Sequence, residues 1–151
     1  MKNLVLKMLV VSFGFLSCNI DADDIVTDDN QSNNVSECDF QSEINSDDYA
    51  IANAEEITIN EITIDNDCLK INFWAGGCNG DSWEMRLIDS GAILESLPVQ
   101  RNLRIDFVSE ELCEKAILRE YTFDISNLQI ENNESLMLNI INNNSSILYE
   151  Y

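Results

Sequence analysis

The sequence contains no histidine, a single proline, five glycines and only eight basic residues among its 151 positions. The missing histidine removes the commonest general base, the usual partner of serine and cysteine nucleophiles, and the commonest transition-metal ligand. So little proline and glycine argues against a collagen-like or linker composition. The shortage of basic side chains opposes nucleic-acid binding, because affinity for phosphate backbones comes mostly from lysine and arginine.

Acidic residues dominate what is present. The chain has 28 acidic residues against eight basic ones, which gives a formal charge of −20 at pH 7. Such a surface would attract cations or basic protein surfaces, although a solvated exterior alone also explains it. A hydrophobic content of 45% is enough for a core, and the length suits one domain.

Residues 1–17 have the three parts of a secretory signal peptide. Lys2 and Lys7 supply positive charge, residues 8–16 form a short apolar run, and the small Ser17 precedes Cys18. The run is far shorter than the roughly 18 residues that cross a bilayer as a stable helix. We therefore interpret it as a removable signal rather than a permanent span.

Phe15-Leu16-Ser17-Cys18 resembles the lipobox of bacterial lipoproteins, in which the cysteine receives lipid and becomes the mature N-terminus. The resemblance implies lipidation of Cys18 and attachment to a membrane through acyl chains. Phe15 and Leu16 are bulkier than the residues of the ideal pattern. The alternative is an ordinary signal peptide followed by a cysteine that forms a disulfide.

Residues 18–45 are rich in aspartate and asparagine, and we predict a disordered acidic tether there, followed by a folded domain over 46–151. Acidic residues directly after a lipidated cysteine also resemble the surface-export signal of lipoproteins from the Bacteroidetes group. That resemblance implies an outer-membrane location facing the cell exterior. The alternative is a flexible linker that is simply acidic.

From Glu56 onward, short alternating segments separated by Asn, Asp and Gly turns predict an all-β, antiparallel β-sandwich of seven or eight short strands. Ile57 and Ile59 alternate on one parity and Ile62 and Ile64 on the other, which predicts a bulge near residues 60–61. We predict Trp83 to be a core residue. The other alternating sets are Leu69, Ile71 and Phe73; Met85 and Leu87; Leu103, Ile105 and Phe107; Ile117, Tyr121, Phe123 and Ile125; Leu136, Leu138 and Ile140; and Ile147 and Tyr149.

Residues 56–151 contain the motifs Cys68-Leu69, Gly76-Gly77-Cys78, Ser82-Trp83-Glu84, Pro98-x-Gln100-Arg101 and Phe123-Asp124-Ile125-Ser126. Together these motifs resemble a family of small, largely uncharacterised lipoproteins of Bacteroidetes-type bacteria. This resemblance implies a cell-envelope address and a β-rich fold, and no established activity. More remotely, the Gly-Gly-Cys turn, a later cysteine and the Phe-Asp-Ile-Ser motif resemble a broader set of small lipoproteins. Members of that broader set often carry a histidine shortly after the turn, where this chain has Ser82-Trp83.

Four cysteines remain once Cys18 is set aside, an even number that suits disulfides in an oxidising compartment. Of the three pairings, we favour Cys78 with Cys113, because both lie at strand-edge turns, and then Cys38 with Cys68 by elimination. A thiolate zinc site is the alternative, but the sequence has neither Cys-x-x-Cys spacing nor histidine.

Two turns offer oxygen ligands that suit calcium, residues 65–67 (Asp-Asn-Asp) and 79–81 (Asn-Gly-Asp). Neither follows an EF-hand pattern. Asn and Asp in turns commonly serve local backbone bonding, and we favour that interpretation. We expect no cofactor and no resident metal.

Three residues are candidates for ligand binding: Trp74, Arg101 and Arg104. Exposed next to polar residues, Trp74 would suit sugar or protein recognition, but packing in the core or at an edge is the favoured alternative. Arg101 and Arg104 would project to opposite faces of one strand, and with Arg86 could form a small basic patch for a carboxylate or phosphate. The favoured alternative is internal pairing with Glu84, Glu95 or Asp106.

The functional hypothesis is a lipid-anchored, non-enzymatic module that binds an extracellular protein or glycan. We expect no enzymatic activity and name no catalytic residue, because 28 acids make carboxylate pairs unavoidable by chance. The alternatives are a structural or envelope-assembly component and an inhibitor or immunity-type protein.

Overall fold

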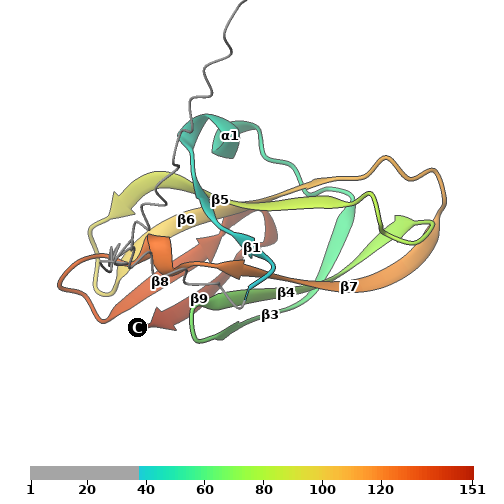
Figure 1. Ribbon diagram of the computed structural model, residues 1–151. Helices are drawn as coiled ribbons and strands as arrows, with labels where there is room; N and C mark the ends of the chain where they lie inside the picture. Colours follow the sequence, from blue (N-terminus) through green and yellow to red (C-terminus); the bar gives the residue numbers. More distant parts are fainter. Residues whose placement is uncertain (1–37) are drawn as a thin grey trace, which may run out of the picture. The chain divides into compact units, whose positions relative to one another are not determined.

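The computed structural model describes residues 38–151, which form a β-sandwich-like all-β fold of nine strands in two sheets (Figure 1). This confirms the predicted fold class. The predicted signal peptide, Cys18 and the tether up to residue 37 lie outside the described residues. The elements are β1 (Phe40–Gln41), β2 (Glu43–Ile44), α1 (Ser46–Ile51), β3 (Ile57–Asp65), β4 (Cys68–Gly77), β5 (Glu84–Leu94), β6 (Val99–Val108), β7 (Lys115–Asp124), η1 (Ser126–Leu128), β8 (Ser135–Ile140), η2 (Ile141–Asn143) and β9 (Ser145–Glu150).

The two sheets are mixed rather than purely antiparallel. One has the order β1-β7-β4-β3 and the other β2-β5-β6-β8-β9. Three pairs, β1 with β7, β2 with β5 and β6 with β8, run parallel. Strand β8 lies parallel to β6 because the chain crosses to the other sheet as β7 and then returns. The prediction of a purely antiparallel sandwich is therefore wrong for these three strand pairs and correct for the other four.

The core lies between the two sheets. Leu69, Ile71 and Phe73 of β4 face Leu103 and Ile105 of β6, and all five are buried. Their period-2 spacing puts them on one face of each strand, which is why the predicted alternating sets form the core. Removing such side chains from water is the main favourable contribution to folding.

Trp83 lies in the core, as predicted. Its ring packs against Phe73 and Phe107, with centroid distances of 5.9 and 5.6 Å. Phe73 and Phe107 also contact each other edge to face at 5.8 Å. These separations are typical of favourable aromatic pairs. The cluster closes the end of the core next to the β4–β5 turn.

Strand β3 has the bulge that the change of parity predicts. Its register with β4 shifts between Ile59 and Glu61. A second irregularity interrupts the β5–β6 pairing between Asp89 and Ile93. Gly91, within this second irregularity, has a φ of +78°, a conformation that favours glycine.

Residues 40–44 connect the two sheets ahead of Ser46, where the folded domain was expected to begin. Strand β1 pairs with β7, and β2 then pairs with β5 in the other sheet (Figure 1). Ser42, between them, is buried: its N–H donates to Asp124 O at 2.9 Å and its hydroxyl to Asn127 Oδ1 at 2.6 Å. The Asn127 side chain donates back to Ser42 O at 2.8 Å. Residues 40–44 form a strap across one side of the sandwich.

Both favoured cysteine pairings are confirmed. Cys38 bonds to Cys68 and Cys78 to Cys113, with Cα separations of 5.6 and 4.8 Å. The first holds the strap to the start of β4, and the second joins the turn after β4 to the loop before β7. The two disulfides close loops of 30 and 35 residues, and in the loop-entropy account each disulfide stabilises the fold by about 4 kcal/mol at most.

Within residues 38–151, no helix is both long enough and apolar enough to cross a bilayer.

Candidate functional site

Arg101, a candidate ligand-binding residue, points into the core instead of to the surface. It is only 8% exposed, and its Nη1 lies 2.8 Å from Oδ1 of Asp89, which is 0% exposed. The Gly91 N–H donates to the same oxygen at 2.6 Å. Burial raises the pKa of Asp89 above its ordinary value, against the opposing effects of Gly91 and Arg101. Sequence reasoning missed this pair because the acids considered as partners were Glu84, Glu95 and Asp106, whereas Asp89 follows Met85 and Leu87 on the inward-facing side of β5.

Arg104 lies on the opposite face of β6, as the spacing predicts, and holds helix α1. Its Nη1 donates to Tyr49 O at 3.2 Å and to Ala50 O at 3.4 Å, and the guanidinium lies 4.9 Å from the Tyr49 ring centroid. The Asn45 side chain caps α1 by accepting from two N–H groups of its first turn. Arg104 therefore has a structural role in docking this helix.

The basic patch considered from the sequence does not form. Arg86 pairs with Asp106 at 2.8 Å, one of the acids expected as an internal partner, and with Asp48 at 2.8 Å. Arg101 and Arg104 are engaged elsewhere, one in the core and one on α1. The three arginines are therefore not gathered to grip one anion.

The two candidate calcium turns lie at opposite ends of β4. Ten strand residues separate them, which is about 30 Å at a rise of 3.3 Å per residue. Asp65 pairs with Lys70 at 2.8 Å, and Asp67 accepts from the buried Tyr149 hydroxyl. In the described part of the chain, no group of three or more acidic or cysteine side chains is placed to hold a metal ion. The two turns thus cannot share one ion.

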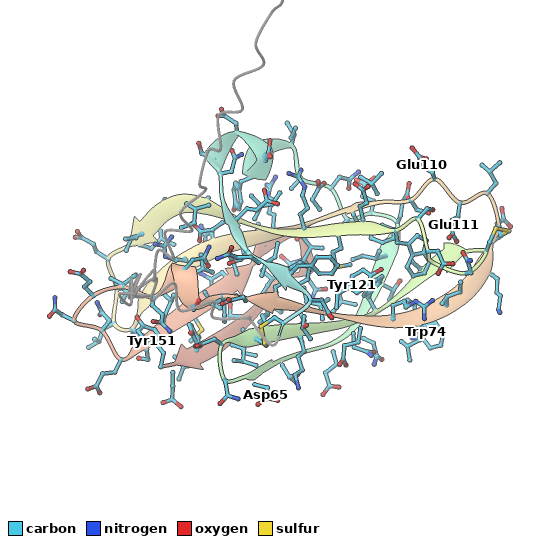
Figure 2. The ribbon with its side chains drawn as sticks, viewed as in Figure 1. Asp65, Trp74, Glu110, Glu111, Tyr121 and Tyr151 are labelled. Carbon is cyan, nitrogen blue, oxygen red and sulfur yellow. A yellow bond between two sulfur atoms is a disulfide. The ribbon has the colours of Figure 1, made fainter. Side chains whose placement is uncertain are left out.

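A carboxylate joins the β6–β7 loop to the β4–β5 turn, at the end of β4 that follows Gly77, and we call this arrangement the clamp. Glu111, from the β6–β7 loop, accepts from the N–H groups of Cys78, Asn79 (3.2 Å), Gly80 (2.9 Å) and Asp81 (3.1 Å). Successive N–H groups that point into one concavity make an anion-binding nest, and here it holds the chain's own carboxylate. Figure 2 shows Glu111 at this loop end, next to a disulfide.

The clamp depends on glycine at two positions. Gly80 has a φ of +79°, and a Cβ on Gly77 would lie 2.8 Å from Trp83 Cζ2. Partial desolvation alone would raise the pKa of Glu111, but hydrogen bonds from the backbone N–H groups of residues 78–80 and 82 outweigh it and lower the pKa below its ordinary value. The Gly-rich turn hinted at a special backbone, but nothing in the sequence pointed to an acid some 30 residues away.

Trp74 lies on the outer face of the four-stranded sheet and points away from the core (Figure 2). It is 42% exposed, although packing was the favoured expectation. Its cross-strand neighbour on β7 is Leu118, which is 43% exposed, and its neighbour on β3 is Thr58. Asn72 and Glu120 form the next cross-strand pair. We call these five residues the Trp74 face.

The acidic excess is not neutralised inside the domain. Residues 38–151 carry 22 acidic and six basic side chains. Lys70, Arg86 and Arg101 form salt bridges, while Arg104 and Arg119 donate to backbone carbonyls. The described basic groups are thus largely used within the fold, and many acids face solvent uncompensated.

These features define a sandwich-like β domain with two disulfides, and solved structures share its fold. A protein of unknown function, DUF1344, from Bacteroides vulgatus matches with a TM-score of 0.51 at 13% identity. A NigD-like immunity protein from Bacteroides caccae matches with a TM-score of 0.52 at 8% identity. The matches cover 74% and 73% of this chain but only 56% and 58% of those proteins. No family model and no curated protein sequence matches the chain.

Replacing Asp89 with alanine leaves the Arg101 charge buried without its partner. We expect Asp89→Ala to lower the free energy of unfolding by about 3–5 kcal/mol, measured by urea denaturation. The double variant Asp89→Leu/Arg101→Met removes both charges and should recover most of the loss. An Asp89→Ala protein as stable as wild type would contradict the buried pairing.

Replacing Glu111 with glutamine removes the charge that the nest stabilises. A carboxylate whose folded pKa is lowered adds stability above its unfolded pKa, near 4.5, and loses it as the pH falls through the folded value. At pH 7, Glu111→Gln should therefore unfold at a lower urea concentration than wild type. The difference between the two midpoint concentrations should close below pH 4.5. Glu110→Gln, the same change at an adjacent exposed acid, is the control. An equal gap for both variants, or one independent of pH, would contradict the clamp.

Proposed function

We propose that this protein is a lipid-anchored, non-enzymatic binding module of the cell envelope, which recognises a basic protein partner through the Trp74 face. The observation that carries the proposal is an exposed tryptophan and leucine side by side on a domain with 22 acidic and six basic residues. Exposed aromatic residues often anchor protein interfaces, and uncompensated charge steers partners of opposite sign.

The neighbours of Trp74 favour a protein over a glycan. Sugar rings commonly stack on aromatic platforms, whereas Trp74 is flanked across the strands by Leu118 and Thr58. Asn72 Oδ1 accepts from Asn60 Nδ2 at 2.8 Å, which orders the polar side of the face. A mixed apolar and polar surface of this kind suits the centre and rim of a protein interface.

Anchoring rests on the sequence together with the disulfides. The two disulfides suit an oxidising compartment, and Cys18 stands where lipid would be attached. We place the domain on the outer face of the outer membrane, with the residues between Cys18 and Cys38 as the connection. An envelope-assembly role would use the same anchoring.

The likeness to a NigD-like immunity protein favours a second candidate, an immunity-type protein that neutralises a toxic protein by binding it. Such a role is also non-enzymatic, and it would use the same accessible surface. The two candidates differ in the consequence of binding rather than in its physics.

The test is site-specific photo-crosslinking on living cells of the natural host. A photoactivatable residue in place of Trp74 should give a discrete adduct with a protein rich in lysine and arginine. The same residue in place of Ile51, which is 77% exposed on α1, should not. No adduct at position 74, or equal adducts at both positions, would contradict the proposal.

The same cells test the location. Protease added to intact cells should remove the domain, and Cys18→Ala should abolish membrane attachment and the adduct at position 74. A domain that is protected until the outer membrane is broken would contradict the outward orientation.

A further inference from the structure

Strand β7 is paired along one side and largely open along the other. It pairs with β4 over ten residues, from Lys115 to Asp124, but with β1 only at Phe123 and Asp124. At the β1 side, the Thr122 N–H donates to the Asp39 carboxylate at 3.0 Å. Thr122 is therefore the last residue of β7 to which the described N-terminal segment hydrogen-bonds along this edge, and residues 115–121 lie beyond that contact.

The alternation of a strand fixes which backbone groups face the open side. The main-chain groups of Thr122 point away from β4, so those of Glu120, Leu118 and Ala116 do so too. No residue within 38–151 hydrogen-bonds the main-chain groups of these three residues on that side. A row of free donors and acceptors is a template for another strand.

The Cys38–Cys68 disulfide explains why the chain's own strap stops there. Cys68 belongs to β4, on the other side of β7 from β1. A chain tied to Cys68 turns away from the β7 edge at residue 38, which accounts for the pairing of β1 with β7 only at Phe123 and Asp124.

The other sheet edges carry features that discourage pairing. Strand β3 is bulged between Ile59 and Glu61, and β5 is irregular between Asp89 and Ile93. Strand β9 has only six residues. The register of β7 with β4 is continuous over ten residues, without a bulge or proline. Bulges and short strands are two of the features that protect an edge, and β7 has neither; the protection that it does carry is charge, at Lys115, Arg119 and Glu120.

We propose that the open edge of β7 is a docking site for an extended, basic segment of a partner protein, which adds to the four-stranded sheet as a further strand. This inference rests on the proposed function and deepens it. Main-chain hydrogen bonds to Leu118 and Glu120 provide the pairing, and side-chain contacts on the Trp74 face provide the selection. A second copy of this chain is a poor occupant, because both copies carry the same acidic excess.

The face beside the edge defines the segment's pattern. Leu118 and Glu120 project to the same side, two residues apart, with Trp74 behind Leu118. An incoming strand places alternate residues next to them, so an apolar residue meets Leu118 and a basic residue meets Glu120. The expected segment is apolar-x-basic in extended conformation.

The test uses a defined peptide and the full-length lipoprotein in detergent micelles. The probe is the capped peptide Val-Thr-Lys-Thr-Val-Thr-Lys-Thr, and the control probe has the same sequence with N-methyl groups on alternate residues, which removes pairing donors. Binding is measured by fluorescence anisotropy. We expect the N-methylated peptide to bind wild type at least about tenfold more weakly than the parent peptide.

Two variants separate pairing from charge. Glu120→Pro removes one outward N–H without touching the β4 ladder, and Glu120→Ala removes the charge but keeps the N–H. We expect the proline variant to bind the parent peptide about tenfold more weakly than the alanine variant. Thermal unfolding checks that both are folded, and the peptide pair on wild type decides the matter should the proline variant unfold.

Failure of this inference is distinct from failure of the proposed function. Equal binding of both peptides to wild type, or no binding of either, overturns strand addition at β7. The proposed function stands or falls separately with the photo-crosslink at position 74, which needs no strand pairing.

Discussion

The rest of the structure depends on the apolar contact between the inner faces of the two sheets. Leu69, Ile71 and Phe73 can be buried only if every second residue of β4 faces the other sheet, which leaves the alternate residues outside. Trp74 is outside because Phe73 is inside. The exposed tryptophan is therefore a direct consequence of the core register, and its neighbours on β3 and β7 are fixed by the same register.

The alternation of apolar and polar residues was sufficient to predict the core strands and the position of the β3 bulge. Period-2 alternation located the core strands, and the change of parity between Ile59 and Ile62 located the β3 bulge. Both disulfides followed from the number of cysteines and their positions at turns. Arg101 and Arg104 were placed on opposite faces correctly, since the faces of a strand alternate.

The remaining features depend on partners that are distant in sequence. The strap at residues 40–44 is held by Asn127, and the nest at residues 78–82 is filled by Glu111. Arg101 can be buried because Asp89, which follows Met85 and Leu87 on the inner face of β5, neutralises its charge. No periodicity reports such contacts, because an acid in a loop and an acid in a clamp look identical in a sequence. The parallel β6–β8 pairing was missed because it also joins residues that are distant in sequence.

Strand addition at β7 requires that this strand be paired along one side only, and amide hydrogen exchange of the full-length protein reports that pairing residue by residue. The N–H groups of Arg119 and Tyr121 point toward β4, whereas those of Leu118 and Glu120 point to the open side. We expect slow exchange at Arg119 and Tyr121 and fast exchange at Leu118 and Glu120, an alternating profile along one strand. Slow exchange at all four amides would mean that the edge is already covered, and would contradict the account.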